Sequence, residues 1–298
     1  MGPTVLKRAL FVLGFCLLTI AGDRLIAGFL GRAVCSSQTR FSEMYRGGKP
    51  SSIVAIGNSR GVNALYSPAI RDEIGIEAFN LSYNGMSMVI AEMLLRDYLD
   101  RNEKPRMLVL EITNLGDKND LLQDLKLYRG LSIRIDSMLA AELPLTATTG
   151  RVMHLYNFNG EMFLRSLFYL HRSDQSWVNR YRILPSVLAS VGTAAPEEPR
   201  ILPENLEALR RVLALSRDEG IPTRLLVSPY LPGCVERMAG FRAWTAAVRK
   251  FTGPRVRIWD YSAAVKDPSC FADRVHMNEQ GSRLFIERLK ADGFFDGI

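Results

Sequence analysis

Short apolar runs and longer amphipathic stretches alternate along most of this chain. Residues 53–56 are four consecutive apolar residues, three of them β-branched, which is typical of a fully buried strand. Further strands are predicted over 77–82, 107–112, 223–228 and 256–260, and helices over 61–73, 86–100, 203–219, 240–251 and 278–290. Strands that alternate with helices favour a parallel sheet covered on both faces. The pattern therefore predicts an α/β fold.

Two stretches interrupt this alternation. Residues 31–50 are polar and indicate a linker or a short irregular helix. Residues 115–200 mix aromatic residues with arginines and indicate an insertion of mostly helical pieces after the third strand. The insertion either lines a groove for sugar rings or an anionic chain, or forms a small apolar core with a solvated basic face. The expected domains are an N-terminal segment over 1–32, a linker over 33–50, and an α/β domain over 51–298.

The N-terminal segment has the features of an export signal. Lys7 and Arg8 precede an uncharged run over 9–22, and apolar residues resume over 25–30 after a charged pair. The first run is shorter than the roughly 20 residues that span a bilayer core, but the whole segment is long enough. A membrane anchor is favoured over a signal peptide cleaved near residues 19–21, because apolar character resumes. Either alternative exports the rest of the chain and leaves the cationic end in the cytoplasm.

Composition adds limits on the partners. The 298 residues are 47% hydrophobic and 23% charged, which is ordinary globular usage, and carry a net charge of +7. The basic residues are scattered, so no nucleic-acid partner is expected; an anionic membrane surface or an acidic polymer accounts for the sign equally well. No cysteine spacing resembles a zinc site. Cys234 and Cys270 are either a disulfide of an exported domain or two free thiols.

Polar residues that could perform chemistry follow the predicted strands. Ser59 comes after the strand over 53–56, and Asp273 and His276 lie in the loop after the fifth strand. Because parallel strands end at one edge of a sheet, these residues could meet there. His276 would take the proton of the Ser59 hydroxyl during attack, and Asp273 would orient the imidazole. Taken alone, Ser59 has the simpler interpretation of a helix N-cap.

The same edge offers groups for the remaining roles in acyl transfer. The Ser59 N–H, the Gly85 N–H and the Asn114 side-chain amide are candidate oxyanion donors. Arg60 and Asn84 are candidate substrate contacts. Glu111, near the end of the strand over 107–112, either takes a polar role or pairs with a neighbouring Arg or Lys.

In this order the residues resemble the four blocks of the SGNH (GDSL-like) hydrolase superfamily. The blocks are Gly57-Asn58-Ser59, Gly85 within residues 84–87, Asn114 within 112–114, and Asp273-Arg274-Val275-His276. They extend over about residues 50–290, and the last is the most specific. Asn58 stands where the family usually has Asp, and Ile112 and Leu115 replace the usual Gly and Asp. The resemblance implies a flavodoxin-like three-layer α/β/α sandwich with a mostly parallel five-stranded sheet.

Within the superfamily, the N-terminal anchor and the insertion resemble the exported polysaccharide O-acetyltransferase branch, such as alginate O-acetylation proteins and the D-alanyl transfer protein. That resemblance implies a polysaccharide acceptor, an acyl group supplied by a membrane-bound O-acyltransferase, and no metal or organic cofactor. It also implies a single-pass protein of the cytoplasmic membrane with a periplasmic or other extracytoplasmic catalytic domain. A carbohydrate acetyl esterase and a non-catalytic polysaccharide-binding scaffold are the alternatives.

Overall fold

The computed structural model describes residues 3–193, 195, 198–254 and 256–298. The chain folds into two compact units, each built from two separate stretches. Unit 1 contains residues 1–46 and 122–172, and unit 2 contains residues 47–121 and 173–298. More than half of the expected insertion, residues 122–172, thus belongs to the same unit as the N-terminal segment, and the expected domain bounds stay a prediction.

Unit 2 is built on a five-stranded sheet whose neighbouring strands are all parallel. The strands are β1 (Ile53–Ile56), β2 (Ala78–Asn80), β3 (Met107–Glu111), β4 (Thr223–Val227) and β5 (Ile258–Asp260). Their order across the sheet is β2-β1-β3-β4-β5, the order of flavodoxin-like folds. Every residue of β1 and of β3 is buried, as expected for central strands. The predicted α/β class is confirmed.

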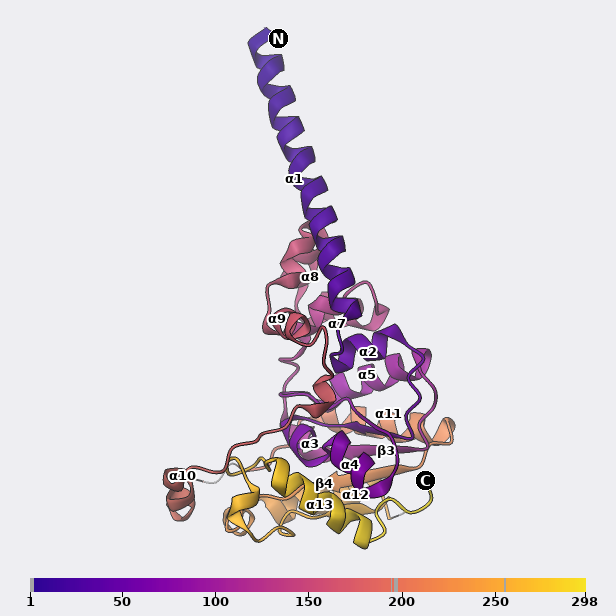
Figure 1. The fold of residues 1–298 in the computed structure, drawn as a ribbon, viewed down its shortest axis with the longest axis vertical. Helices are drawn as coiled ribbons and strands as arrows, with labels where there is room; N and C mark the ends of the chain where they lie inside the picture. The colour runs from indigo at the N-terminus through magenta and orange to yellow at the C-terminus, as the bar shows by residue number, and fades with distance from the viewer. Residues whose placement is uncertain (1–2, 194, 196–197, 255) are drawn as a thin grey trace. The chain divides into compact units, whose positions relative to one another are not determined.

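Helices cover both sides of this sheet (Figure 1). They are α3 (Ser59–Ala64), α4 (Ser67–Ile74), α5 (Met88–Arg101), α11 (Pro203–Asp218), α12 (Phe241–Thr252) and α13 (Glu279–Ala291). The short helix α10 (Pro185–Ala189) also belongs to this unit, but it lies apart from the sheet (Figure 1) and has no buried residue. The single helix predicted over 61–73 is divided in two, because Pro68 lies in the first turn of α4. Gly75 ends α4 with φ of 74°, a conformation that glycine adopts without strain. Short 3₁₀ turns complete the unit: η1 (Ile112–Gly116), η4 (Asp174–Ser176), η5 (Ser190–Gly192), η6 (Val235–Arg237) and η7 (Pro268–Cys270).

Unit 1 is entirely helical in its described residues. Its elements are α1 (Pro3–Ser36), α2 (Arg40–Arg46), α6 (Leu122–Leu125), η2 (Lys126–Tyr128), α7 (Ile133–Glu142), α8 (Pro144–Val152), η3 (His154–Phe158) and α9 (Glu161–Phe168). The stretch expected as a linker contains the end of α1 and all of α2. Phe41 and Tyr45 of α2 pack on the ring of Tyr128, with centroids 6.0 and 5.4 Å away. These contacts integrate the polar stretch into the core of unit 1.

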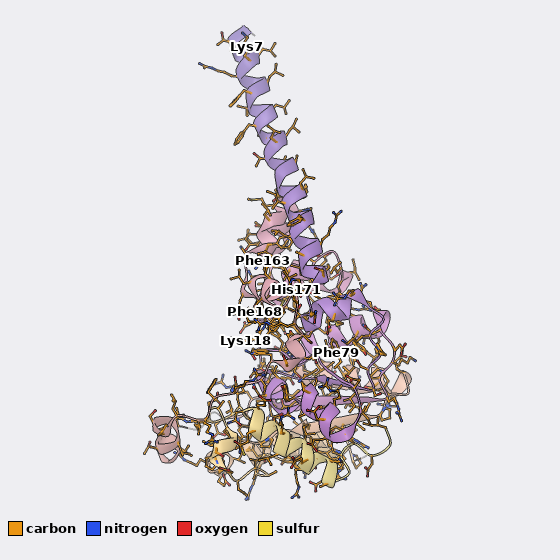
Figure 2. All side chains as sticks on the ribbon, in the orientation of Figure 1. Lys7, Phe79, Lys118, Phe163, Phe168 and His171 are labelled. Carbon is orange, nitrogen blue, oxygen red and sulfur yellow. The ribbon has the colours of Figure 1, made fainter. Side chains whose placement is uncertain are left out.

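The first half of α1 has no neighbouring element, and its side chains radiate outward (Figure 2). Its large apolar side chains are exposed; Phe11, for example, is 76% exposed. Burial begins only at Ala27 and Val34. The helix is long and apolar enough to cross a membrane, although a signal sequence meets the same criteria.

Candidate active site

The chain presents Ser59 at the carboxyl end of β1 through a close approach of two strands. A Cβ on Gly57 would lie 2.7 Å from the Cβ of Glu111 on the neighbouring strand β3, so only glycine fits here. Asn58 then starts α3, because its side-chain oxygen accepts the N–H of Arg60 at 3.0 Å. The N-cap is therefore Asn58, and the simpler interpretation of Ser59 as the cap is wrong. The Ser59 hydroxyl is left for another partner.

That partner is His276, and three side chains from distant parts of the sequence form one chain of hydrogen bonds. Ser59 Oγ lies 2.6 Å from His276 Nε2, and His276 Nδ1 lies 2.8 Å from Asp273 Oδ2. The Asp273 carboxylate holds the proton on Nδ1, which leaves Nε2 to accept the Ser59 hydroxyl hydrogen. This is the arrangement in which an imidazole can remove a proton from a serine.

Asp273 is itself fixed by the backbone of its own loop. Its Oδ1 accepts the N–H groups of Val275 and His276, both at 2.8 Å. Burial acts to raise the pKa of Asp273, but the hydrogen bond and charge of His276 and the two backbone N–H groups outweigh it. The pKa of this carboxyl is therefore below its ordinary value of 3.8, and the group is ionised at neutral pH.

Arg60 holds the loop that carries His276. Its guanidinium donates to the carbonyl of Val275 at 2.9 Å and to the carbonyl of Ser228 at the end of β4 at 2.5 Å. Its Nε lies 3.6 Å from the wholly buried carboxylate of Glu111. The guanidinium also lies over the ring of Tyr230, 3.5 Å from its centroid. Arg60 thus positions the site through these contacts, and its predicted role as a substrate contact stays a prediction.

Glu111 behaves as the expected partner of a neighbouring arginine. Besides Arg60, its carboxylate accepts the hydroxyls of Thr113 and Ser228 at 2.7 and 2.9 Å. A buried carboxylate is tolerated only where such partners satisfy it. The ends of β3 and β4 and the start of α3 are thus joined through one side chain.

Ser59 and His276 open onto a cleft of about 600 Å³ in unit 2. Among the residues that the structure describes, its walls are formed by Asn58, Ser59, Arg60, Thr113, Gly116, Asp117, Glu198, Pro199, Arg200, Tyr230, Val275 and His276. Ser59 is half-buried, so a substrate or a water molecule can reach it. Charges of both signs line the cleft, which gives it no strong overall preference for anions or cations.

The predicted oxyanion donors and substrate contacts differ in how close they lie to the cleft residues. Asn114 lies in η1 directly after Thr113 of the cleft, is wholly buried, and its amide has no hydrogen-bond partner among the described residues. Asn84 and Gly85 form an exposed turn after β2, next to Tyr83, whose N–H donates to the Gly57 carbonyl at 3.1 Å. Neither Asn84 nor Gly85 is among the cleft residues. Their roles, and that of the Ser59 N–H, stay predictions.

Sequence reasoning missed two residues of the cleft, Asp117 and Arg200. Asp117 accepts the side-chain N–H of Asn58 at 2.8 Å across the cleft. This explains why an amide stands at position 58: a second carboxylate would face Asp117 without a proton to donate. Asp117 belongs to the polar stretch after β3, so its position at a strand end was the signal available. Arg200, exposed on the cleft wall, had no such signal, because the disrupted pattern before α11 gave it no structural position.

Cys234 and Cys270 are both buried as free thiols, so the structure does not contain the disulfide considered from the sequence. Burial raises the pKa of both thiols above the ordinary value of 9.0. Within the described residues no group of three or more His, Cys, Asp or Glu is arranged to hold a metal ion.

No protein-family model and no curated protein matches the sequence. Among solved structures, the chain is similar to one whose description reads "The structure of a putative platelet activating factor from Streptococcus pneumonia". The two share 13% sequence identity with a TM-score of 0.41, over 96% of this chain and 98% of the other. That likeness is too distant to support a fold or an activity, which rest on the geometry described above.

Proposed function

We propose that this protein is a serine acyl-ester enzyme of the SGNH type, an O-acetyltransferase that modifies a polysaccharide outside the cytoplasm. The observation that carries the proposal is the continuous contact from Ser59 through His276 to Asp273, at 2.6 and 2.8 Å. The long apolar α1 supports membrane anchorage. The acyl donor would come from a membrane-bound O-acyltransferase, as the family resemblance implies.

The reaction needs two transfers at Ser59. In the first, Ser59 Oγ bonds to the acyl carbon while its proton passes to His276 Nε2, and that proton then leaves with the oxygen of the donor ester. In the second, His276 takes the proton of a sugar hydroxyl, whose oxygen bonds to the acyl carbon; the bond from that carbon to Ser59 Oγ then breaks, and His276 returns the proton to Ser59 Oγ. The unpartnered amide of Asn114 supports its proposed role as a donor to the negatively charged intermediates.

Hydrolysis to acetate is the second candidate, and the half-exposed position of Ser59 in a polar cleft favours it. The same triad serves both reactions, since water replaces the sugar hydroxyl in the second transfer. Release of acetate from an acetyl ester should be compared with acetyl incorporation into an added glycan. Incorporation that rises with glycan concentration while acetate release falls supports transfer.

Reaction with a fluorophosphonate probe tests the nucleophile itself. Wild-type protein should be labelled at Ser59, while Ser59→Ala should be unlabelled and should lose turnover by about 10⁶-fold. Ser269→Ala is the matched control, because Ser269 is a serine of the same unit outside the cleft. Equal labelling of wild type and Ser59→Ala would exclude the proposed enzyme and leave a binding scaffold.

A further inference from the structure

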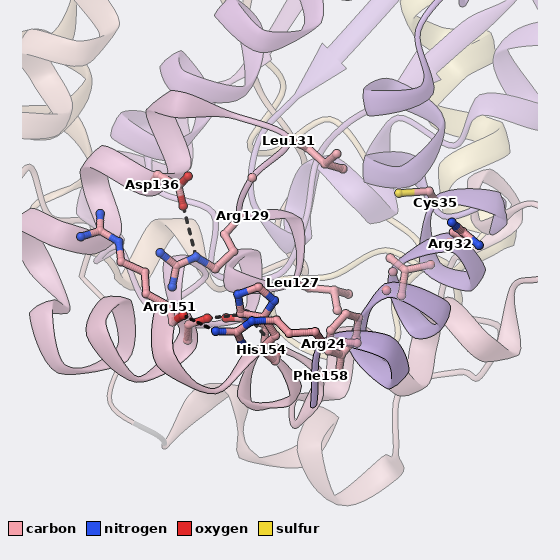
Figure 3. A pocket seen from close by; sticks show the side chains of 17 residues that line it. Arg24, Arg32, Cys35, Leu127, Arg129, Leu131, Asp136, Arg151, His154 and Phe158 are labelled. Carbon is pink, nitrogen blue, oxygen red and sulfur yellow. Dashed lines mark hydrogen bonds and ion pairs between the residues drawn. The ribbon is translucent and has the colours of Figure 1, made fainter. Parts of the chain in front are cut away.

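Unit 1 contains a cavity that the proposed chemistry does not use. It has a volume of about 620 Å³ and lies between the second half of α1 and the segment from η2 to η3. Figure 3 shows its wall, in which Arg24, Arg129 and His154 occupy the centre. The charged side chains of the wall are Arg24, Arg32, Arg129, Arg151 and Asp136. Four guanidinium groups thus surround a cavity to which the described chain contributes one carboxylate.

Among the described residues, two of these guanidinium groups make hydrogen bonds or ion pairs with the protein and two do not. Arg24 donates to the Val152 carbonyl at 3.1 Å, and Arg129 pairs with Asp136 at 3.3 Å. Arg32 and Arg151 are exposed, and neither side chain has a hydrogen bond or ion pair within the described part of the chain. The cavity therefore offers two free planar cations, one on each side of its wall (Figure 3), and each guanidinium group can bind two phosphate oxygens.

The length of the apolar run places this cavity near a membrane surface. The uncharged stretch over 9–22 is about 21 Å long as a helix, while the bilayer core is about 30 Å thick. A span of about 20 residues that begins after Arg8 ends close to Gly28. The outer boundary of the hydrocarbon layer thus falls beside Arg24 and Ala27, which line the cavity.

The residues of unit 1 around Asp23 are also suited to a membrane interface. Asp23 accepts the N–H groups of His154 and Leu155 at 2.8 and 2.9 Å. These hydrogen bonds stabilise its carboxylate near the boundary of the hydrocarbon layer, where an unpaired charge would be costly. Directly beside that contact, Val152 and Met153 are 65% and 58% exposed. Exposed apolar side chains next to basic ones are typical of elements that lie in a membrane interface.

The net positive charge of the chain is concentrated in unit 1. Unit 1 holds twelve Lys and Arg against six Asp and Glu, which gives +6 of the net +7. Unit 2, with 26 against 25, is nearly neutral. The basic character of the chain therefore belongs to the unit that carries the apolar helix, where it can be attracted to anionic lipids.

We propose that the cavity of unit 1 binds the phosphate headgroup of an anionic phospholipid, with Arg32 and Arg151, on opposite sides of the cavity (Figure 3), as separate cationic ligands for the phosphate oxygens. The apolar part of the wall, formed by Leu127, Leu131 and Phe158, accommodates the first carbons of the lipid chains, which free phosphate lacks. This inference rests on the membrane anchorage in the proposed function and is independent of the chemistry at Ser59.

The test uses the full chain in a neutral detergent, with dioleoylphosphatidylglycerol as the probe. Native mass spectrometry should detect one retained lipid, and the melting temperature should rise with lipid concentration. Arg32→Ala/Arg151→Ala should weaken the apparent affinity roughly ten- to thirtyfold, since each cation near the surface contributes to binding. Arg217→Ala/Arg242→Ala removes the same charge from exposed positions of unit 2 and should bind as wild type does.

Control ligands test which chemical group the cavity recognises. An equal shift with dioleoylphosphatidylcholine, with inorganic phosphate, or with polygalacturonate as an acidic polysaccharide would overturn the proposal, as would equal binding by Arg32→Ala/Arg151→Ala. Arg32→Lys/Arg151→Lys guards against misfolding, because it retains the charge and should lose only part of the affinity. Ser59→Ala should bind the lipid normally, so that loss of the enzymatic proposal and loss of this one give different results.

Discussion

The two units differ in how their chemistry is held together. In unit 2 the reactive groups sit at strand ends, and Arg60 and Glu111 connect those ends through buried contacts. In unit 1 the charged groups surround an open cavity, and two of its four arginines make no side-chain hydrogen bond or ion pair with the described residues. Unit 2 thus holds its polar groups in place through buried contacts, whereas unit 1 keeps cationic groups exposed, which fits the anion binding that we propose for it.

Among substitutions that keep Ser59, Asp273→Asn should reduce kcat at the site of unit 2 the most. The amide can present the wrong group to His276 Nδ1, so the imidazole is held in the tautomer that cannot accept the Ser59 proton. We expect kcat for acetyl-ester cleavage to fall about 10⁴-fold. Asp267→Asn, in an exposed loop of the same unit, is the control. An Asp273→Asn enzyme of near-normal kcat would show that Asp273 does not orient the base.

Asn114→Ala should produce the next largest loss. If its buried amide donates to the oxyanion, its removal lowers kcat by about 10²–10³-fold with little change in KM. If Asn114 is only a buried polar residue without a partner, the same change leaves kcat unchanged and stabilises the fold, because an unsatisfied buried group is costly. Steady-state kinetics and urea denaturation of the same protein separate the two outcomes.

Asn58→Asp should destabilise unit 2 by about 1–3 kcal/mol, because the new carboxylate faces Asp117 in place of a hydrogen-bond donor. Asn58→Asp/Asp117→Asn restores one donor and one acceptor, so it should regain most of the lost stability. Chemical denaturation followed by tryptophan fluorescence measures both variants. Absence of rescue would mean that the contact between these two side chains is not what position 58 requires.

Asp23→Ala should destabilise unit 1 and leave unit 2 unchanged. It removes the acceptor of two backbone N–H groups, a loss comparable to that of a helix cap, about 1 kcal/mol. Hydrogen exchange should accelerate at His154 and Leu155, while acetyl-ester cleavage at Ser59 stays at the wild-type rate. Glu161→Ala removes an exposed carboxylate from the same unit and should leave exchange at those amides unchanged.

The sequence was informative where local pattern and tertiary structure agree. The run over 53–56 and the strand over 107–112 are continuous apolar segments, and both are central buried strands. Ser59, Asp273 and His276 could be chosen because strand ends of a parallel sheet share an edge. Which residue capped α3 was not predictable, because Asn58 and Ser59 are both good caps and the choice depends on Asp117, far along the chain.

Unit 1 was beyond such reasoning. Its core joins α2 to Tyr128 across 80 residues of intervening sequence, and neither partner lies in a strongly periodic segment. The polar stretch over 31–50 resembles a linker because the side chains that bury it belong to the insertion. The basic cavity has the same origin, since Arg32 and Arg151 line one cavity only when the two stretches of unit 1 fold against each other.

The position of Asp23 along α1 has a consequence for processing of the protein. The large apolar side chains between Val5 and Ile20 are exposed, whereas Asp23 itself accepts the amide N–H groups of His154 and Leu155. A peptidase that cut just before Asp23 would remove the hydrophobic arm and none of the buried contacts of the unit. One polypeptide could thus exist as a tethered form and a released form that share the same folded body.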